Sequence, residues 1–390
     1  MTPMDMTLMD VALTRRSIRA AALLAALILA VPVRAQNILI GVSTPATGPA
    51  AIASEWERWG IDLAQEEINA SGGVLGRKLE TMTLDNRCNP SEAVNVANRL
   101  VEAKVVAIVG AHCSSAHLAS MPIVKDAKVP MITGIASNPQ ITDQSGVGGN
   151  DWAFRINPSD RAMMDALGAY LGSKKIFKSV AVVAEDSDFG RGGAAAFQAV
   201  AEKAGIAILS TDFHPQNTPD YTSILTRLQQ GRPDAIATFQ LGGDSLNFLR
   251  NAMQMGLRIP FTGRVELGGR NLQIIEAGGM EGSISAWTYS VEIATPENLA
   301  FVAKIKARHG ATPYLQTWGS YDSMRIIAQA IGEAGSTEPT KVRDAMKAMK
   351  FTTVFGKRVA FDDHNQAGKY VILQSVNNGK VTVADIVEAK

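Results

Sequence analysis

The stretch that decides the fold is Leu79–Ser115, which reads LETMTLDNRCNPSEAVNVANRLVEAKVVAIVGAHCSS. Its start, residues 79–85, and the later segment 105–109 have the short, apolar and β-branched pattern of strands. Between them, the segment that begins at Pro90 has the pattern of a helix with proline in its first turn. A strand, a helix and a second strand in this order predict two neighbouring parallel strands joined by a crossover helix.

The same alternation of short strands and helices continues along most of the chain, which has 390 residues. Sheets of this kind are parallel and are covered by helices on both faces. The strands are too many for one small sheet, so we expect an α/β protein with two doubly wound parallel-sheet lobes. The expected strands are residues 37–44, 79–85, 105–109, 129–133, 179–184, 206–211, 235–239 and 259–262; the expected helices are 54–70, 90–103, 160–172, 192–203, 221–229, 245–255, 296–309 and 317–333, before a β-rich tail at 352–386.

The N-terminal residues 1–35 have the pattern of an export signal. An arginine-rich segment ending at Arg19 precedes an uninterrupted apolar run over residues 20–31, and small residues suit cleavage near Ala35. The alternative is a membrane anchor, for which the apolar run is short. We therefore expect a cleaved signal peptide and a periplasmic mature protein, exported by the Sec or the twin-arginine route.

Charge and motif content exclude several function classes. Lysine and arginine together number 38 and aspartate and glutamate 37, so neither nucleic acid nor a membrane surface is an expected partner. The chain has no Gly-x-Ser-x-Gly, His-Glu-x-x-His, Walker or Rossmann motif. His112 and His117 lack a neighbouring carboxylate pattern and make a poor metal pair. We therefore expect no catalytic residue, no metal and no cofactor.

The two cysteines, Cys88 and Cys113, are expected to pair because the chain is exported. Each follows one strand of the opening stretch, and neighbouring parallel strands end at the same sheet edge. We predict a disulfide that stabilises the fold by about 3–4 kcal/mol in the chain-entropy model. The alternative is a catalytic Cys113 beside His112.

Two loops that follow adjacent strands have the chemistry of an anion site. The loop 110–115 reads Gly-Ala-His-Cys-Ser-Ser, and the loop 134–139 reads Gly-Ile-Ala-Ser-Asn-Pro. In open α/β sheets, ligands bind beyond the carboxyl ends of the strands, where helix N-termini present free N–H groups. The small residues, hydroxyls and N–H groups of both loops favour a bound carboxylate. For one loop alone, serines that only cap a helix are the alternative.

Several segments together resemble the periplasmic leucine/isoleucine/valine-binding proteins, the amino-acid branch of the type I solute-binding proteins of ABC transporters. The matching segments are residues 40–43 (Ile-Gly-Val-Ser), 47–49 (Thr-Gly-Pro), 68–76 (Ile-Asn-Ala-Ser-Gly-Gly-Val-Leu-Gly), 85–90 (Asp-Asn-Arg-Cys-Asn-Pro), 110–115, 355–356 (Phe-Gly) and 361–362 (Phe-Asp). The resemblance implies two lobes joined by a three-crossover hinge. Lobe 1 comprises residues 36–155 plus 288–351, and lobe 2 comprises residues 156–287 plus 352–390.

The resemblance also implies a role in transport. The lobes close on a small ligand, and the protein, a monomer and not an enzyme, delivers that ligand to the permease subunits of an ABC importer. A periplasmic sensor subunit is the alternative.

The resemblance further implies which residues bind the ligand in an interlobe cleft. Ser114 donates to the ligand carboxylate, and Ser115 is its neighbour. In the next loop, Ser137 takes the family's hydroxyl position and Ile135 contributes through its backbone. In lobe 2, Phe189 takes the position of an aromatic residue that faces the ligand.

The chain departs from the family in the part of lobe 2 that holds the ligand amine. The family's tyrosine falls on Leu241, and its acidic residue falls on Val265 or Glu266. If Glu266 faces the cleft, a branched-chain or other apolar amino acid is expected. If Glu266 is an ordinary solvated carboxylate, an aromatic or aliphatic carboxylate without an amine fits better, because an unpaired buried ammonium is costly.

The helix expected at residues 54–70 begins with Ser54-x-x-Glu57, the pattern of a capping box. Trp56 and Trp59 widen its apolar stripe beyond that of a helix packed on one side. One interpretation places both rings in the core. The other places Trp56 in the cleft, where it suits a bulky or aromatic ligand.

Overall fold

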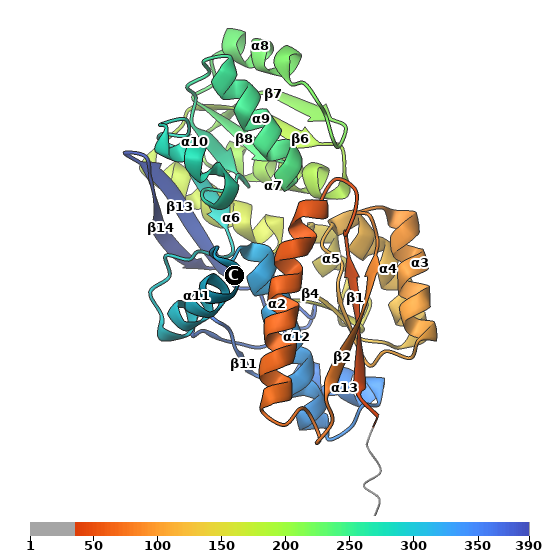
Figure 1. The fold of residues 1–390 in the computed structure, drawn as a ribbon. Coiled ribbons are helices and arrows are strands. Elements are labelled where there is room, and N and C mark those ends of the chain that lie inside the picture. The colour runs from red at the N-terminus through yellow and green to blue at the C-terminus, as the bar shows by residue number, and fades with distance from the viewer. Residues whose placement is uncertain (1–35, 390) are drawn as a thin grey trace, which may run out of the picture. The chain divides into compact units, whose positions relative to one another are not determined.

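The computed structural model describes residues 36–389, so the expected signal peptide and Lys390 lie outside the described residues. The first sheet is parallel, with the strand order β2-β1-β3-β4-β5; Figure 1 labels β1, β2 and β4. Its strands are β1 (Ile38–Thr44), β2 (Leu79–Asp85), β3 (Ile108–Gly110), β4 (Met131–Thr133) and β5 (Ala153–Arg155). The order reverses at β1, which pairs with both β2 and β3, and ligands bind beyond such a reversal in doubly wound sheets.

The helices of this part of the chain cover both faces of the first sheet. They are α2 (Ala51–Ala70), α3 (Pro90–Glu102), α4 (Ser114–Ala127), α5 (Pro139–Gln144), α11 (Pro296–His309), α12 (Leu315–Ala334) and α13 (Pro339–Ala348). Figure 1 shows α2 and α12 side by side. They approach closely because Gly60 has no side chain, and a Cβ there would collide with the carbonyl oxygen of Thr317.

The second parallel sheet has the order β7-β6-β8-β9. Its strands are β6 (Ser179–Glu185), β7 (Ala207–His214), β8 (Ala235–Phe239) and β9 (Phe261–Gly263); the helices around it are α6 (Asp160–Lys174), α7 (Asp188–Lys203), α8 (Thr222–Gly231), α9 (Gly242–Gln254), the 3-10 turn η1 (Gly269–Asn271) and α10 (Leu272–Glu276). An antiparallel sheet with the order β10-β13-β14 joins β10 (Ile284–Trp287) to β13 (Tyr370–Asn377) and β14 (Lys380–Glu388). A short hairpin pairs β11 (Phe351–Thr352) with β12 (Arg358–Val359).

The expected fold class, two α/β lobes with parallel sheets, is confirmed. One local prediction is wrong. Helix α2 begins at Ala51 and not at Ser54, its N-cap is Ala50, and no side chain caps it. The carboxylate of Glu57, expected in a capping box, instead accepts a hydrogen bond from the Thr44 hydroxyl at 2.8 Å.

The two hydrophobic clusters indicate which segments of the chain belong to each lobe. The hydrophobic cluster around β1, α2 and α12 includes Val354, Phe355 and Val359, whereas Val371 and Leu373 of β13 belong to a cluster with α6, α7 and β6. Ala367 also belongs to the first cluster, so we propose the same two lobes with the last crossover after Ala367, which places residues 352–367 in lobe 1. Within residues 36–389, no helix is both long and apolar enough to cross a membrane.

Candidate functional site

A cavity of about 80 Å³ lies where the loops after the strands of the two parallel sheets meet. A water molecule needs about 10–15 Å³ on this scale, so the cavity suits a small molecule. All eight residues predicted to bind the ligand line it: Trp56, Ser114, Ser115, Ile135, Ser137, Phe189, Leu241 and Glu266. Side chains that were not predicted also line it, including His112, Glu185, Gln216, Gln240, Arg264, Arg270 and Trp287.

The N-terminus of α4 forms one end of the cavity. The N-cap is Cys113, and no side chain caps the helix, so its first N–H groups have no partner within the helix. The Ser114 hydroxyl oxygen accepts from the Asn138 N–H at 3.2 Å, which leaves the Ser114 proton free to donate. A helix N-terminus with a hydroxyl beside it is an anion site by both its N–H groups and its dipole.

The neighbouring loop is already engaged in the protein's own hydrogen bonds. The Ser137 hydroxyl donates to Asp160 at 3.0 Å. The Ile135 N–H donates to the Thr133 hydroxyl at 3.2 Å, and its carbonyl accepts from Asn157 at 2.6 Å. The backbone contribution expected of Ile135 is therefore used within the loop. Ser114, in contrast, keeps its hydroxyl proton available to an anion, and among the described residues the neighbouring Ser115 hydroxyl makes no hydrogen bond.

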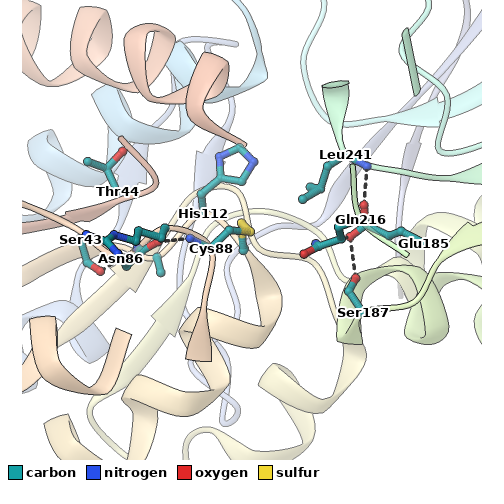
Figure 2. Close-up of a disulfide and its surroundings, with 12 residues drawn as sticks. Ser43, Thr44, Asn86, Cys88, His112, Glu185, Ser187, Gln216 and Leu241 are labelled. Carbon is teal, nitrogen blue, oxygen red and sulfur yellow. Dashed lines mark hydrogen bonds between the residues drawn. A yellow bond between two sulfur atoms is a disulfide. The ribbon is translucent and has the colours of Figure 1, made fainter. Parts of the chain in front are cut away.

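The predicted disulfide between Cys88 and Cys113 is confirmed, with their Cα atoms 5.5 Å apart. A catalytic Cys113 is therefore wrong, since its sulfur is bonded. Asn86 holds the Cys88 side of the bridge: its side chain accepts from the Cys88 N–H and donates to the Ser43 hydroxyl, both at 2.9 Å (Figure 2). The bridge thus fixes the N-terminus of α4 to the loop after β2.

Glu185, at the end of β6, organises the lobe 2 wall of the cavity. Its carboxylate accepts from the Ser187 hydroxyl at 2.6 Å, from Gln216 at 3.2 Å and from the Leu241 N–H at 2.8 Å (Figure 2). Burial raises the pKa of Glu185, and these hydrogen bonds oppose the shift. Glu185 therefore holds the loops of Ser187 and Leu241 in place, while Phe189 and Leu241 give this wall apolar surface.

Glu266 is a carboxyl group in the lobe 2 wall of the cavity. Within residues 36–389, its carboxylate makes no hydrogen bond and no ion pair within 4.0 Å. Burial raises its pKa to about 7, and the positive charge of Arg270 opposes this shift. A carboxyl group without a partner at the wall of a cavity is available to a ligand amine.

Arg264 is a buried cation that sequence patterns did not reveal. Its Nε lies 3.5 Å from Oδ1 of Asp160, and its guanidinium lies 4.8 Å from the centre of the Trp287 ring. Burial raises the pKa of Asp160 and the nearby Arg264 charge opposes the shift. The two residues are 104 positions apart in the sequence, and no local pattern connects them.

Trp56 satisfies both interpretations of the sequence. Its ring is 6% exposed and stacks on Tyr314, with ring centres 3.9 Å apart and planes at 18°. It also lines the cavity, and the Arg270 guanidinium of lobe 2 lies 4.9 Å from its ring centre. Elsewhere, the Asn138 side chain donates to the Asp188 carbonyl of lobe 2. These two contacts connect residues of the two proposed lobes.

His112 and His117 interact with different partners, His112 with Glu57 and His117 with the loop after β3. Among the described residues, no group of three or more histidine, cysteine, aspartate or glutamate side chains is placed to hold a metal ion. His117 is fully buried, and its Nδ1 lies 3.0 Å from the Gly110 carbonyl oxygen and 3.2 Å from the Ala111 nitrogen. Burial lowers its pKa to about 3, so at neutral pH it is an uncharged support of the loop after β3.

Comparison with known proteins agrees with this geometry. The family model described as "Periplasmic binding protein" matches residues 37–380. The chain belongs to the periplasmic binding protein family. A leucine-, isoleucine-, valine-, threonine- and alanine-binding protein of Pseudomonas aeruginosa is 29% identical over 329 residues, which are 84% of this chain and 87% of that protein. The resemblance predicted from the sequence is confirmed.

Solved structures of the family show the same fold. A leucine-binding protein of Thermotoga maritima has a TM-score of 0.79 at 26% identity, over 90% of this chain and 99% of that one. A branched-chain amino acid transporter substrate-binding protein of Streptococcus pneumoniae, in complex with isoleucine, has a TM-score of 0.80 at 25% identity, with the same coverage. This periplasmic binding protein therefore has the two-lobe architecture of relatives that bind amino acids.

Proposed function

We propose that this periplasmic binding protein captures a small carboxylate, foremost an apolar amino acid, and delivers it to the permease subunits of an ABC importer. The observation that carries the proposal is the pairing of two opposite sites in one cavity. The N-terminus of α4 with Ser114 suits a carboxylate, and the unpaired carboxyl group of Glu266 suits an ammonium. An α-amino acid carries both groups. Relatives named for leucine, isoleucine and valine support this ligand class.

A carboxylate without an amine is the second candidate ligand. Two observations favour it. Burial raises the pKa of Glu266 to about 7, so the group is partly neutral at neutral pH. Leu241 stands where the family has a tyrosine, and it lines an apolar wall together with Phe189 and Trp56. Such a wall suits an aromatic or aliphatic acid.

Calorimetry on the mature wild-type protein and on Glu266→Gln distinguishes the two ligand classes. The ligands are leucine, phenylalanine and their deaminated analogues. For an amino-acid binder, leucine binds more tightly than its analogue, and Glu266→Gln weakens leucine about 10- to 100-fold, because a charge-assisted hydrogen bond contributes about 1.5–3 kcal/mol. Tighter binding of the deaminated analogues to the wild type would establish the second class instead.

The transport role adds three further proposals. The protein acts in the periplasm as a monomer after removal of residues 1–35, it catalyses no reaction, and its lobes open and close around the ligand. Small-angle scattering tests the motion, since a ligand that contacts both lobes favours the closed state. The expected result is a smaller radius of gyration at saturating leucine, and an unchanged profile contradicts lobe closure. A sensor role predicts ligand binding without uptake in a reconstituted importer.

A further inference from the structure

The proposed function leaves one buried pair at the cavity unused, His112 and Glu57. Nδ1 of His112, in the loop after β3, lies 2.6 Å from Oε1 of Glu57 on α2, and the two side chains are only 6% and 4% exposed. The other Glu57 oxygen accepts from the Thr44 hydroxyl at 2.8 Å. The carboxylate can only accept here, so Nδ1 carries the proton and the imidazole ring has a fixed orientation.

The second ring nitrogen of His112 is open to the cavity. Within residues 36–389, Nε2 of His112 makes no hydrogen bond. It is also not one of the fully buried polar atoms without a partner, so part of its surface is accessible. His112 lines the cavity, and Figure 2 shows its ring next to the disulfide. The side chains that α2 contributes to the same cavity, Ile52, Ala53 and Trp56, are apolar. A polar nitrogen in this wall loses its water when a ligand enters and then needs a partner on the ligand.

We propose that His112 binds a hydroxyl group of the ligand, so that, among small carboxylates of matched shape, those with a hydroxyl bind more tightly than those without one. This inference rests on the proposed function, because it takes the ligand carboxylate to lie at Ser114. His112 and Ser114 are two positions apart in the sequence, so their Cα atoms are separated by at most about 7 Å. One small molecule can therefore contact both side chains. A hydroxyl both donates and accepts, and it therefore satisfies Nε2 in either protonation state.

A second carboxylate on the ligand fits this position less well. Among the described residues, no lysine or arginine lies within 4.0 Å of the Glu57 carboxylate, whose side-chain partners are His112 and Thr44. A further negative charge beside this enclosed pair would be repelled by Glu57, and charge repulsion is strong where water is excluded. A hydroxyl adds no charge.

Matched pairs of ligands that differ in one hydroxyl test the inference by calorimetry on the mature protein. The pairs are threonine and valine, which have nearly the same shape, tyrosine and phenylalanine, and 4-hydroxybenzoate and benzoate. In the wild type, the hydroxylated member of at least one pair is expected to bind about tenfold or more tightly than its partner. In His112→Leu, this ratio is expected to fall to about one. A ratio that survives in His112→Leu, or a wild-type ratio of one in every pair, overturns the inference.

Glu57→Gln provides a second variant, because Glu57 acts on the ligand only by positioning His112. A smaller hydroxyl ratio in Glu57→Gln is expected, whereas loss of packing alone would weaken both members of a pair equally and leave the ratio intact. His364→Gln is the matched control, since this exposed histidine lies outside the residues that line the cavity. A wild type that binds neither leucine nor any of the six compounds contradicts the proposed function and this inference together. Binding without a hydroxyl preference refutes only the inference.

Discussion

Acidification is expected to release an amino-acid ligand through Glu266, whose pKa is about 7. The ionised carboxylate attracts the ligand ammonium, and the protonated form does not. If only the ionised form binds, the affinity for leucine is nearly constant above pH 8 and falls about tenfold for each pH unit below 7, which is about 1.4 kcal/mol per unit. Between pH 8 and pH 5 the dissociation constant should therefore rise about 100-fold.

Calorimetric titrations of leucine at half-unit steps of pH measure this dependence, and two variants act as controls. Glu266→Gln should bind leucine weakly and with a nearly flat pH profile. Arg270→Gln should move the midpoint to higher pH, because the positive charge of Arg270 opposes the rise in the pKa of Glu266. A wild-type affinity for leucine that stays flat or increases on acidification refutes the role assigned to Glu266. An affinity that increases on acidification would instead indicate a ligand without an amine, because such a ligand binds better when Glu266 is protonated.

Three further predictions concern the first lobe. Ser114→Ala should weaken binding of any carboxylate about 10- to 100-fold by calorimetry, through loss of one charge-assisted hydrogen bond, and an unchanged affinity would contradict an anion site at α4. Replacing both Cys88 and Cys113 by serine should lower the free energy of unfolding in urea by about 3.5 kcal/mol, the chain-entropy value for a separation of 25 residues; equal stability would show that the bridge adds nothing. His117, with a pKa lowered to about 3 from 6.5, binds its proton more tightly in the unfolded chain. Stability should therefore fall by up to about 1.4 kcal/mol per pH unit as the pH drops from 6.5 towards 3, and His117→Asn, which lacks this group, should have a shallower acid slope.

Patterns within short stretches of sequence were sufficient to predict the fold and the place of the cavity. The strand–helix–strand pattern around Cys88 and Cys113 depends on neighbouring residues, and so does the uncapped N-terminus of a helix that starts with Ser114. Parallel strands bring such helix starts to one sheet edge without further information. For that reason the residues taken from two loops of lobe 1 lie together in one cavity.

The interactions of Glu57 and Arg264 were not predicted, because their partners are distant in the sequence. Glu57 follows Ser54 at capping-box spacing, yet its carboxylate binds His112, which lies 55 positions away. Arg264, which directly follows β9, has no local pattern, because its partner Asp160 lies at the start of helix α6. Side chains of this kind are placed by the packing of separate elements, and a charge that is enclosed by packing takes the partner that the fold supplies.

The stack of Trp56 and Tyr314 with Arg270 has an optical consequence. The two rings belong to one lobe, and the guanidinium that lies 4.9 Å from the indole centre belongs to the other. Separation of the lobes removes a cation from the face of the indole and admits water beside it, and indole emission responds to both changes. The intrinsic fluorescence of Trp56 therefore reports the distance between the lobes without an attached dye, and replacing the other tryptophans by phenylalanine isolates that signal.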